Sequence, residues 1–256
     1  MKVNLIHVER GYLYNQAYID AGDGPVVILL HGLFGKLGMW KPSVDALMKK
    51  YRVVVPRLPI FELPAESTNI RHLSDVLHEF IECHNLRDVH LVGHAIGGQV
   101  ALMYANDHPL NVDRIVLTGS AGLFESLDFK MAMSPEAANY DFINKQVRSA
   151  FYNAEHTPEQ LVNEIYASIQ SSPRKLKISS LIQSSKTDTV EMFLNHLDHR
   201  VLLLWGLQDK ITPPEVALHF HDFLHNSEVR FIEKCGHLPM VEEPEIFSKH
   251  LMSFLD

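Results

Sequence analysis

The sequence predicts an α/β fold with a mostly parallel central sheet flanked by helices, and three observations lead to it. Short, mostly apolar runs recur along the chain, and several end at a glycine, as 25–30 does before His31-Gly32. Runs of this kind are typical of strands buried on both faces of a parallel sheet. Amphipathic helical patterns alternate with them. The 256 residues, 46% hydrophobic, suffice for a large core that needs neither a metal nor a disulfide.

Each strand is expected at one of these apolar runs. Two opening runs, 3–9 and 12–19, predict a hairpin around Gly11. The later runs predict core strands, and these lie at 25–30, 52–55, 89–92, 114–118, 201–205 and 228–232. Because strands and helices alternate there, right-handed crossovers between parallel strands are expected.

Helices are predicted between the strands and in one long insertion. The apolar residues of 70–81 recur at three- and four-residue steps, and Pro244 stands where a C-terminal amphipathic helix would begin. A further helix is expected near 42–50. From 121 to 199 no strand is evident, and helical patterns occupy 135–152, 158–170, 173–186 and 188–197.

The insertion divides the chain into two parts. We expect residues 1–120 and 200–256 to form the core, and residues 121–199 to form a helical cap, or lid, inserted after the sixth core strand. The alternative is a separate helical domain that has no role at a functional site.

Charge and cysteine content restrict the partners and the compartment. There are 23 basic and 31 acidic residues, which give a net charge of −8, and no basic run stands out, so nucleic acid is not an expected partner. No signal peptide or membrane span is evident, and two cysteines in so long a chain indicate free thiols. We therefore expect a cytoplasmic protein with a small-molecule substrate, either a monomer or a homo-oligomer.

One segment matches a catalytic motif except at its central residue. Gly93-His94-Ala95-Ile96-Gly97 follows a predicted buried strand and opens a helix. This is the context of the nucleophile elbow G-x-S-x-G, in which a strained turn exposes the serine and small residues let the helix approach the sheet. Here Ala95 stands where the serine hydroxyl would be.

With this segment the chain resembles the α/β-hydrolase superfamily, in particular its lidded serine-hydrolase branch, over nearly its whole length. The segment 31–35 resembles the family's oxyanion loop, and Asp209 and His237 follow the last two strands at the positions of the acid and the base. Their order along the chain is that of the fold. The resemblance implies the α/β-hydrolase fold and a catalytic set of Ala95 (the nucleophile position), Asp209 and His237.

The resemblance also implies the rest of the site. Backbone N–H groups of Leu33 or Phe34 and of Ile96 would form the oxyanion hole. Phe34, Trp40 and His94 are candidates for substrate contact, although Phe34 and Trp40 suit core packing equally well. Glu125 is an alternative to Asp209, because some relatives carry the acid after the preceding strand, but Asp209 lies closer to its strand end.

The implied parent activity is hydrolysis of a small ester or related carbonyl compound through a Ser-Asp-His type triad. Because alanine cannot form an acyl-enzyme, three interpretations stay open. The chain is a serine-to-alanine inactivated variant, or a naturally Ala-containing hydrolase in which His237 activates water toward a labile substrate, or a catalytically silent small-molecule binding protein. GHA at the elbow resembles aminoacrylate hydrolases, which fit the second interpretation.

No cofactor and no metal site are predicted. The 16 histidines include His196 and His199, and also His219, His221 and His225, but neither set has a neighbouring cysteine or a carboxylate at a recognised ligand spacing. A catalytic role is not expected for Cys235, which lies on the loop of the base. His31 is expected to hold the oxyanion loop by hydrogen bonds.

Overall fold

The structure, a computed structural model, describes residues 3–6, 16–123, 132 and 134–256. Its described strands form one sheet in the order β1-β2-β4-β3-β5-β6-β7-β8. The strand β2 runs antiparallel to both of its neighbours, β1 and β4, and all the other neighbouring pairs are parallel. Their bounds are β1 Val3–Ile6, β2 Gln16–Ala21, β3 Val26–Leu30, β4 Arg52–Pro56, β5 Val89–His94, β6 Val112–Thr118, β7 Arg200–Gly206 and β8 Ser227–Ile232.

This architecture confirms the predicted α/β class with a mostly parallel sheet. The eight strands lie at the eight predicted runs, and wherever both ends fall on described residues they differ by at most two residues. The turn predicted around Gly11 lies outside the described residues.

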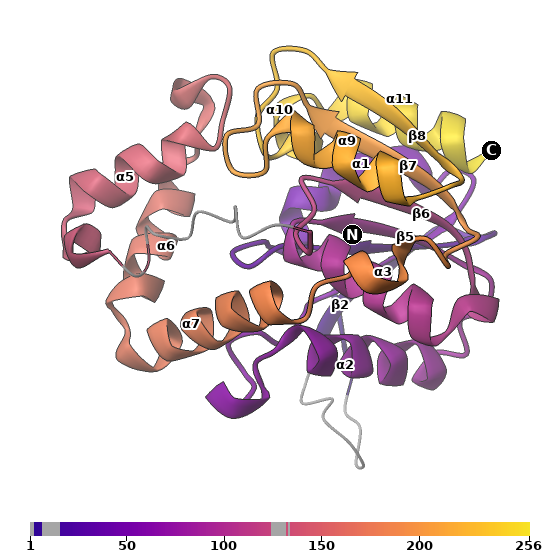
Figure 1. Ribbon diagram of the computed structural model, residues 1–256, viewed down its shortest axis with the longest axis horizontal. Coiled ribbons are helices and arrows are strands. Elements are labelled where there is room, and N and C mark those ends of the chain that lie inside the picture. Colours follow the sequence, from indigo (N-terminus) through magenta and orange to yellow (C-terminus); the bar gives the residue numbers. More distant parts are fainter. Residues whose placement is uncertain (1–2, 7–15, 124–131, 133) are drawn as a thin grey trace.

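Helices cover both faces of the sheet (Figure 1). One face packs against α1 (Lys41–Leu47) and α11 (Pro244–Leu255), and the other against α2 (Ile70–Cys83), α3 (Ile96–Asp107) and α9 (Pro214–Phe223). The first turn of α2 is capped, because Asn69 Oδ1 accepts a hydrogen bond from the His72 N–H at 2.8 Å. The sheet is therefore buried on both sides, as its apolar strands require.

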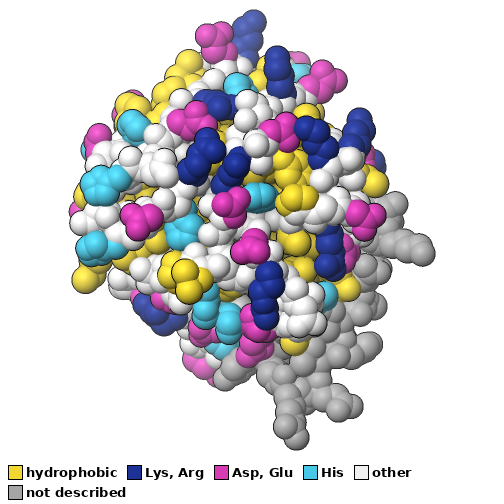
Figure 2. All heavy atoms as spheres, turned by 90° about the vertical axis from the view of Figure 1, so that its right-hand side faces the viewer, with side chains coloured by type: hydrophobic (Ala, Val, Ile, Leu, Met, Phe, Trp, Pro, Cys, Tyr) yellow, Lys and Arg dark blue, Asp and Glu magenta, His cyan; other side chains and the backbone are white. Residues whose placement is uncertain are grey.

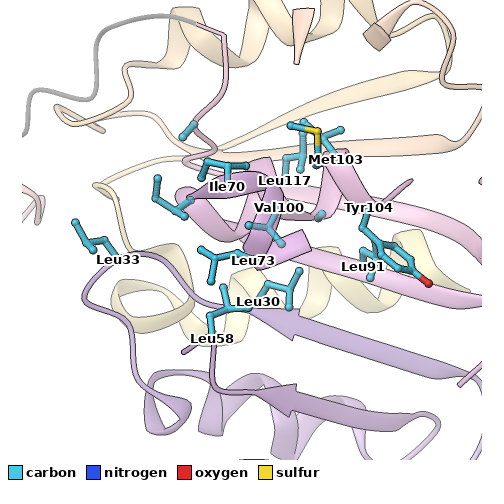
Figure 3. Packing of buried hydrophobic residues seen from close by; sticks show 14 of the residues in the cluster. Leu30, Leu33, Leu58, Ile70, Leu73, Leu91, Val100, Met103, Tyr104 and Leu117 are labelled. Atoms are coloured by element: carbon cyan, nitrogen blue, oxygen red, sulfur yellow. The ribbon is translucent and has the colours of Figure 1, made fainter. Parts of the chain in front are cut away.

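The core beneath α2 and α3 holds in place the end of the sheet where the elbow lies. Figure 3 shows side chains of the strands, among them Leu30, Leu91 and Leu117, in the same cluster as side chains of the two helices. The helix residues labelled there are Ile70 and Leu73 of α2 and Val100, Met103 and Tyr104 of α3. Interiors of this density resist shifts of single elements, so the strand ends that carry the loops are fixed in position.

Between β6 and β7 the chain forms a helical insertion that lies beside the sheet (Figure 1). It contains α5 (Tyr140–Ser149), α6 (Glu159–Gln170), α7 (Ser172–Thr187) and α8 (Glu191–Leu194). The predicted helix 188–197 is reduced to α8, because the Val190 N–H binds the Gly122 carbonyl at 3.0 Å and the chain turns there.

The insertion is anchored to the core through α7. Gln99 of α3 donates from Nε2 to the Ser185 and Asp188 carbonyls at 3.1 and 2.9 Å, and it accepts from Ser185 Oγ at 2.6 Å. The first N–H of α2 donates to Ser184 Oγ at 2.8 Å. Because both core helices hold α7, the insertion has a fixed base on the side of the elbow helix.

The remaining short elements join the main ones. They are α10 (Pro239–Glu242) and the 3-10 turns η1 Leu37–Trp40, η2 Ala65–Ser67, η3 Pro109–Asn111, η4 Pro135–Ala138 and η5 Ala154–His156. Figure 2 shows the face opposite the insertion, where basic and acidic side chains are interspersed. Within the described ranges, no helix combines the length and the apolar character that crossing a bilayer requires.

Candidate active site

The elbow between β5 and α3 keeps a strained backbone at Ala95. This residue has φ 50° and ψ −118°, a conformation that residues with a Cβ rarely adopt. It is held from both sides, because the Ala95 N–H donates to the Thr118 carbonyl and the Ala121 N–H donates to the Ala95 carbonyl, each at 3.1 Å. A Cβ at Gly93 would collide with the Gly98 backbone, so the tight turn depends on that glycine.

Asp209 and His237 form a buried acid–base pair. His237 Nδ1 donates to Asp209 Oδ2 over 2.8 Å, and both residues are at most 8% exposed. Thr212 Oγ1 donates to the same oxygen at 2.9 Å, while the Ile211 and Thr212 N–H groups donate to Oδ1 at 2.8 and 3.0 Å. With Nδ1 carrying the proton, Nε2 of His237 is free to accept one.

The carboxylate is kept charged by its partners. Burial by itself would raise the pKa of Asp209, but the charge of His237 and the hydrogen bonds from His237, Thr212 and Ile211 outweigh it and lower that pKa below its usual value. An ionised, fixed Asp209 orients the imidazole and stabilises its protonated form.

Ala95 and His237 border the same cavity, whose volume is about 380 Å³. The segment 32–36 lines it from the core, and α5 and α6 of the insertion line it from the other side, through residues such as Val147 and Ile165. A Cβ on Gly32 would lie 3.1 Å from the Ala95 Cβ, so the loop predicted to form the oxyanion hole passes directly over the elbow.

Two of the residues predicted for an oxyanion hole line this cavity, and the third directly follows the lining residue Ala95. Leu33 and Phe34 line it, and Ile96 is the first residue of α3, where N–H groups have no acceptor within the helix. The positive end of the α3 dipole points to the same place.

His94 is a neutral residue that supports His237. Its Nε2 donates to the His237 carbonyl at 2.9 Å, and the two rings are 4.7 Å apart between centroids. Burial, followed by the charge of His237, lowers the pKa of His94 to about 3. Its ring also borders the cavity, where the sequence predicted a substrate contact.

The loop of the base is bound to the helical insertion. Glu242 Oε1 accepts from the Gly236 and Leu238 N–H groups at 3.0 and 3.2 Å, and Oε2 accepts from the Tyr152 N–H at 2.7 Å. The His237 N–H donates to the Ala150 carbonyl at 2.7 Å. The chain just after α5 therefore fixes the position of His237.

Trp40 requires a correction. It is fully buried on the opposite face of the sheet, where its ring packs 6.2 Å from that of Phe247 of α11, and it does not border the cavity. The prediction of a substrate contact by Trp40 is wrong, because η1 carries its side chain toward α1 and α11. Phe34 does border the cavity and stacks on Phe61 at 6.5 Å between centroids.

The structure also shows the surroundings of two further residues considered from the sequence, His31 and Cys235. His31 accepts from the Leu58 N–H at Nε2 over 3.0 Å, its Nδ1 lies 2.7 Å from the Gly32 carbonyl, and burial lowers its pKa to about 4. The Cys235 thiol is buried, which raises its pKa and disfavours a thiolate. Glu125, the alternative acid, lies outside the described residues. In the described part of the chain no three histidine, cysteine or acidic side chains are grouped to hold a metal ion.

Two residues of the site were not singled out by the sequence. Gly119 has φ +52°, and a Cβ there would lie 2.9 Å from His237 Nδ1 and 3.3 Å from Asp209 Oδ2, so this glycine gives the pair its room. Thr212 completes the hydrogen bonding of Asp209. Gly119 could have been found from the sequence, because it directly follows a predicted strand. Thr212 could not, because a threonine three residues after an aspartate is not a recognised pattern.

Known proteins resemble the chain over nearly its full length. A family profile described as alpha/beta hydrolase fold matches residues 25–244. A 2-hydroxy-6-oxo-6-(2'-aminophenyl)hexa-2,4-dienoic acid hydrolase of Metapseudomonas resinovorans is 28% identical over 93% of this chain and 86% of its own. Monoacylglycerol lipase ABHD6 of Bos taurus is 26% identical over 91% of this chain and 76% of its own.

A solved structure agrees with these matches. It is MGS-MChE2, an alpha/beta hydrolase enzyme from the metagenome of lagoon sediments of Mar Chica, Morocco. It superposes with a TM-score of 0.77 at 26% identity, and the match covers 97% of each chain.

Proposed function

Since the chain belongs to the alpha/beta hydrolase fold family, we propose that its cavity is the site of a hydrolase for small, mostly apolar esters or related carbonyl compounds. The observation that carries this proposal is the buried Asp209–His237 pair, which borders one cavity together with the strained elbow residue Ala95. Hydrolases among the relatives support the reaction class.

The roles follow from the positions. A hydroxyl at position 95 would attack the carbonyl carbon, and His237 Nε2 would accept its proton while Asp209 stabilises the imidazolium. N–H groups of Leu33 or Phe34 and of Ile96 would hold the oxyanion. His237 would then give that proton to the leaving alcohol as its bond to the carbonyl carbon breaks, which leaves the acyl group on residue 95. Water, deprotonated by His237, would attack the acyl carbon, and the hydroxyl would regain its proton as the acid is released.

Ala95 interrupts this sequence at its first step. Without a hydroxyl no acyl-enzyme forms, and loss of the nucleophile of a serine hydrolase lowers kcat by about a million-fold. We propose that the present chain is the inactivated form of such an enzyme, complete except for one oxygen atom.

The insertion is proposed to act as the lid of this site. Residues of α5 and α6 line the cavity, and the segment after α5 holds the loop of the base. A separate helical domain without a role at the site would not need either contact.

A second candidate mechanism keeps alanine as the functional residue. The Asp209–His237 pair is complete, and because Nδ1 of His237 faces Asp209, the neutral ring could use Nε2 to deprotonate a water molecule that attacks a labile carbonyl. In this mechanism no covalent intermediate forms, and only activated substrates react.

One set of variants separates these functions. Ala95→Ser is assayed beside the parent chain on p-nitrophenyl acetate, butyrate and octanoate, with Ala95→Ser/His237→Ala as the control. We expect Ala95→Ser to raise kcat/KM by about a thousand-fold or more, with the gain lost in the double variant. No gain at any chain length contradicts the serine-hydrolase proposal and leaves a binding protein. Turnover by the parent that disappears in His237→Ala supports the water mechanism.

A further inference from the structure

Among the described residues that line the cavity, one lysine and one carboxylate side chain face each other, Lys36 and Glu164. Lys36 follows the oxyanion loop and Glu164 lies on α6, and their charged groups form an ion pair. Gln160 Nε2, one turn earlier on α6, donates to Glu164 Oε1 at 2.9 Å. The pair therefore joins the core to the insertion across the cavity.

The ion pair leaves the cavity without a net charge from these side chains. The hydrogen bond from Lys36 holds the pKa of Glu164 below its ordinary value, so the carboxylate stays ionised at neutral pH. The other lining residues of the described chain are apolar, or they are uncharged glutamines and the two histidines already discussed. A ligand meets a cation that is already neutralised.

This arrangement discriminates between kinds of carbonyl compound. A carboxylate that leaves water needs a cation or several donors in return. Lys36 can pair with a ligand carboxylate only if its ion pair with Glu164 breaks. The negative charge of Glu164 would then lie beside that of the ligand. An uncharged ligand needs no cation and leaves the Lys36–Glu164 ion pair intact. Its binding is favoured by contact with the apolar wall of the cavity.

We propose that Glu164 is a specificity-determining residue that, by neutralising Lys36, selects uncharged carbonyl substrates against those that bear a carboxylate. The inference deepens the proposed function and rests on it, because it concerns the same cavity. Glu164 touches no reacting atom, so it acts on the selection of the ligand and not on the Asp209–His237 pair.

The size of the effect follows from the exposure of the pair. The Lys36 and Glu164 side chains are 56% and 37% exposed, and ion pairs of this kind are weak because water screens them. Removing the negative charge is therefore expected to shift the preference between charged and uncharged ligands by about two- to fivefold, and not by orders of magnitude.

Direct binding tests the proposal without turnover, because Ala95 cannot form an acyl-enzyme. Affinities of 4-phenylbutyrate and of 4-phenylbutanamide, which differ in charge and little in shape, are measured by calorimetry on the parent, Glu164→Gln and Lys36→Gln/Glu164→Gln. We expect Glu164→Gln to strengthen 4-phenylbutyrate binding about two- to fivefold relative to the amide, and the double variant to abolish that gain. Salt at about 0.5 M should reduce the gain, since it screens an electrostatic effect.

The possible outcomes distinguish a failure of this inference from a failure of the proposed function. If both compounds bind and their ratio is the same in Glu164→Gln as in the parent, the selection role of Glu164 is wrong and the proposed function stands. A gain that persists in the double variant also overturns the inference, because Lys36 would then not be its source. If neither compound binds any form at millimolar concentration, the cavity does not take small apolar carbonyl compounds, and both fail.

Discussion

Replacing Glu242 by glutamine should loosen the link between the insertion and the loop of His237. The carboxylate accepts three backbone N–H groups, from Gly236 and Leu238 on one oxygen and from Tyr152 on the other. An amide can keep its oxygen toward the loop, but its NH₂ then faces the Tyr152 N–H, donor against donor. One charge-assisted hydrogen bond is lost.

A hydrogen bond to a charged group contributes about 1.5–3 kcal/mol, and water can replace part of it because Glu242 is half-buried. We expect the free energy of unfolding to fall by about 1–2 kcal/mol in Glu242→Gln and by about 3 kcal/mol in Glu242→Ala, where all three bonds are lost. Urea unfolding measures both. In the Ala95→Ser form, kcat should fall with KM little changed, because the base and not the cavity is displaced.

Glu243→Gln is the matched control, since it removes the same charge one residue away and its side chain makes no capping hydrogen bond. If Glu242→Gln unfolds at the same urea concentration as Glu243→Gln, the carboxylate does not hold the loop and the reasoning is refuted.

Two further predictions concern the same site. The pKa values of His31 and His94 are lowered to about 4 and about 3 in the folded protein. In the unfolded chain both have a pKa of about 6.5, so on acidification the unfolded chain binds protons that the folded protein does not. Stability should be full above about pH 6.5 and fall continuously toward pH 4, and urea midpoints that stay level over this range would contradict it. Ala95→Gly should raise the free energy of unfolding by up to about 1 kcal/mol, because glycine adopts φ 50° without strain; a lower stability in urea unfolding would show that the elbow is not strained.

Much of the sheet could be predicted from the sequence, because the core strands are apolar runs and several of them end at a glycine. Asp209 and His237 follow two of these strands, and the carboxyl ends of parallel strands meet at one edge, so their proximity was within reach of sequence reasoning. Of the predicted opening hairpin, β1 and β2 do pair antiparallel, and the chain between them lies outside the described residues.

The remaining features depend on which face of an element turns toward which neighbour. Trp40 was expected at the cavity, but the direction of η1 sends it to the opposite face of the sheet. The Glu242 bonds join residues up to 90 positions apart, and Lys36 pairs with a residue in another part of the fold. Such contacts have no local pattern, because tertiary packing alone brings the partners together.

The geometry of the elbow makes Ala95→Ser a direct test of the proposed chemistry. The conformation at position 95 is imposed by the Thr118 carbonyl, the Ala121 N–H and the absence of a Cβ at Gly93, none of which involves the side chain of residue 95. Alanine already carries the Cβ from which a serine oxygen would extend, and that Cβ already borders the cavity with His237. Serine therefore adds one oxygen without asking the backbone to move. A failure to gain activity could not be assigned to a misformed elbow, and it would count directly against the chemistry proposed for the Asp209–His237 pair.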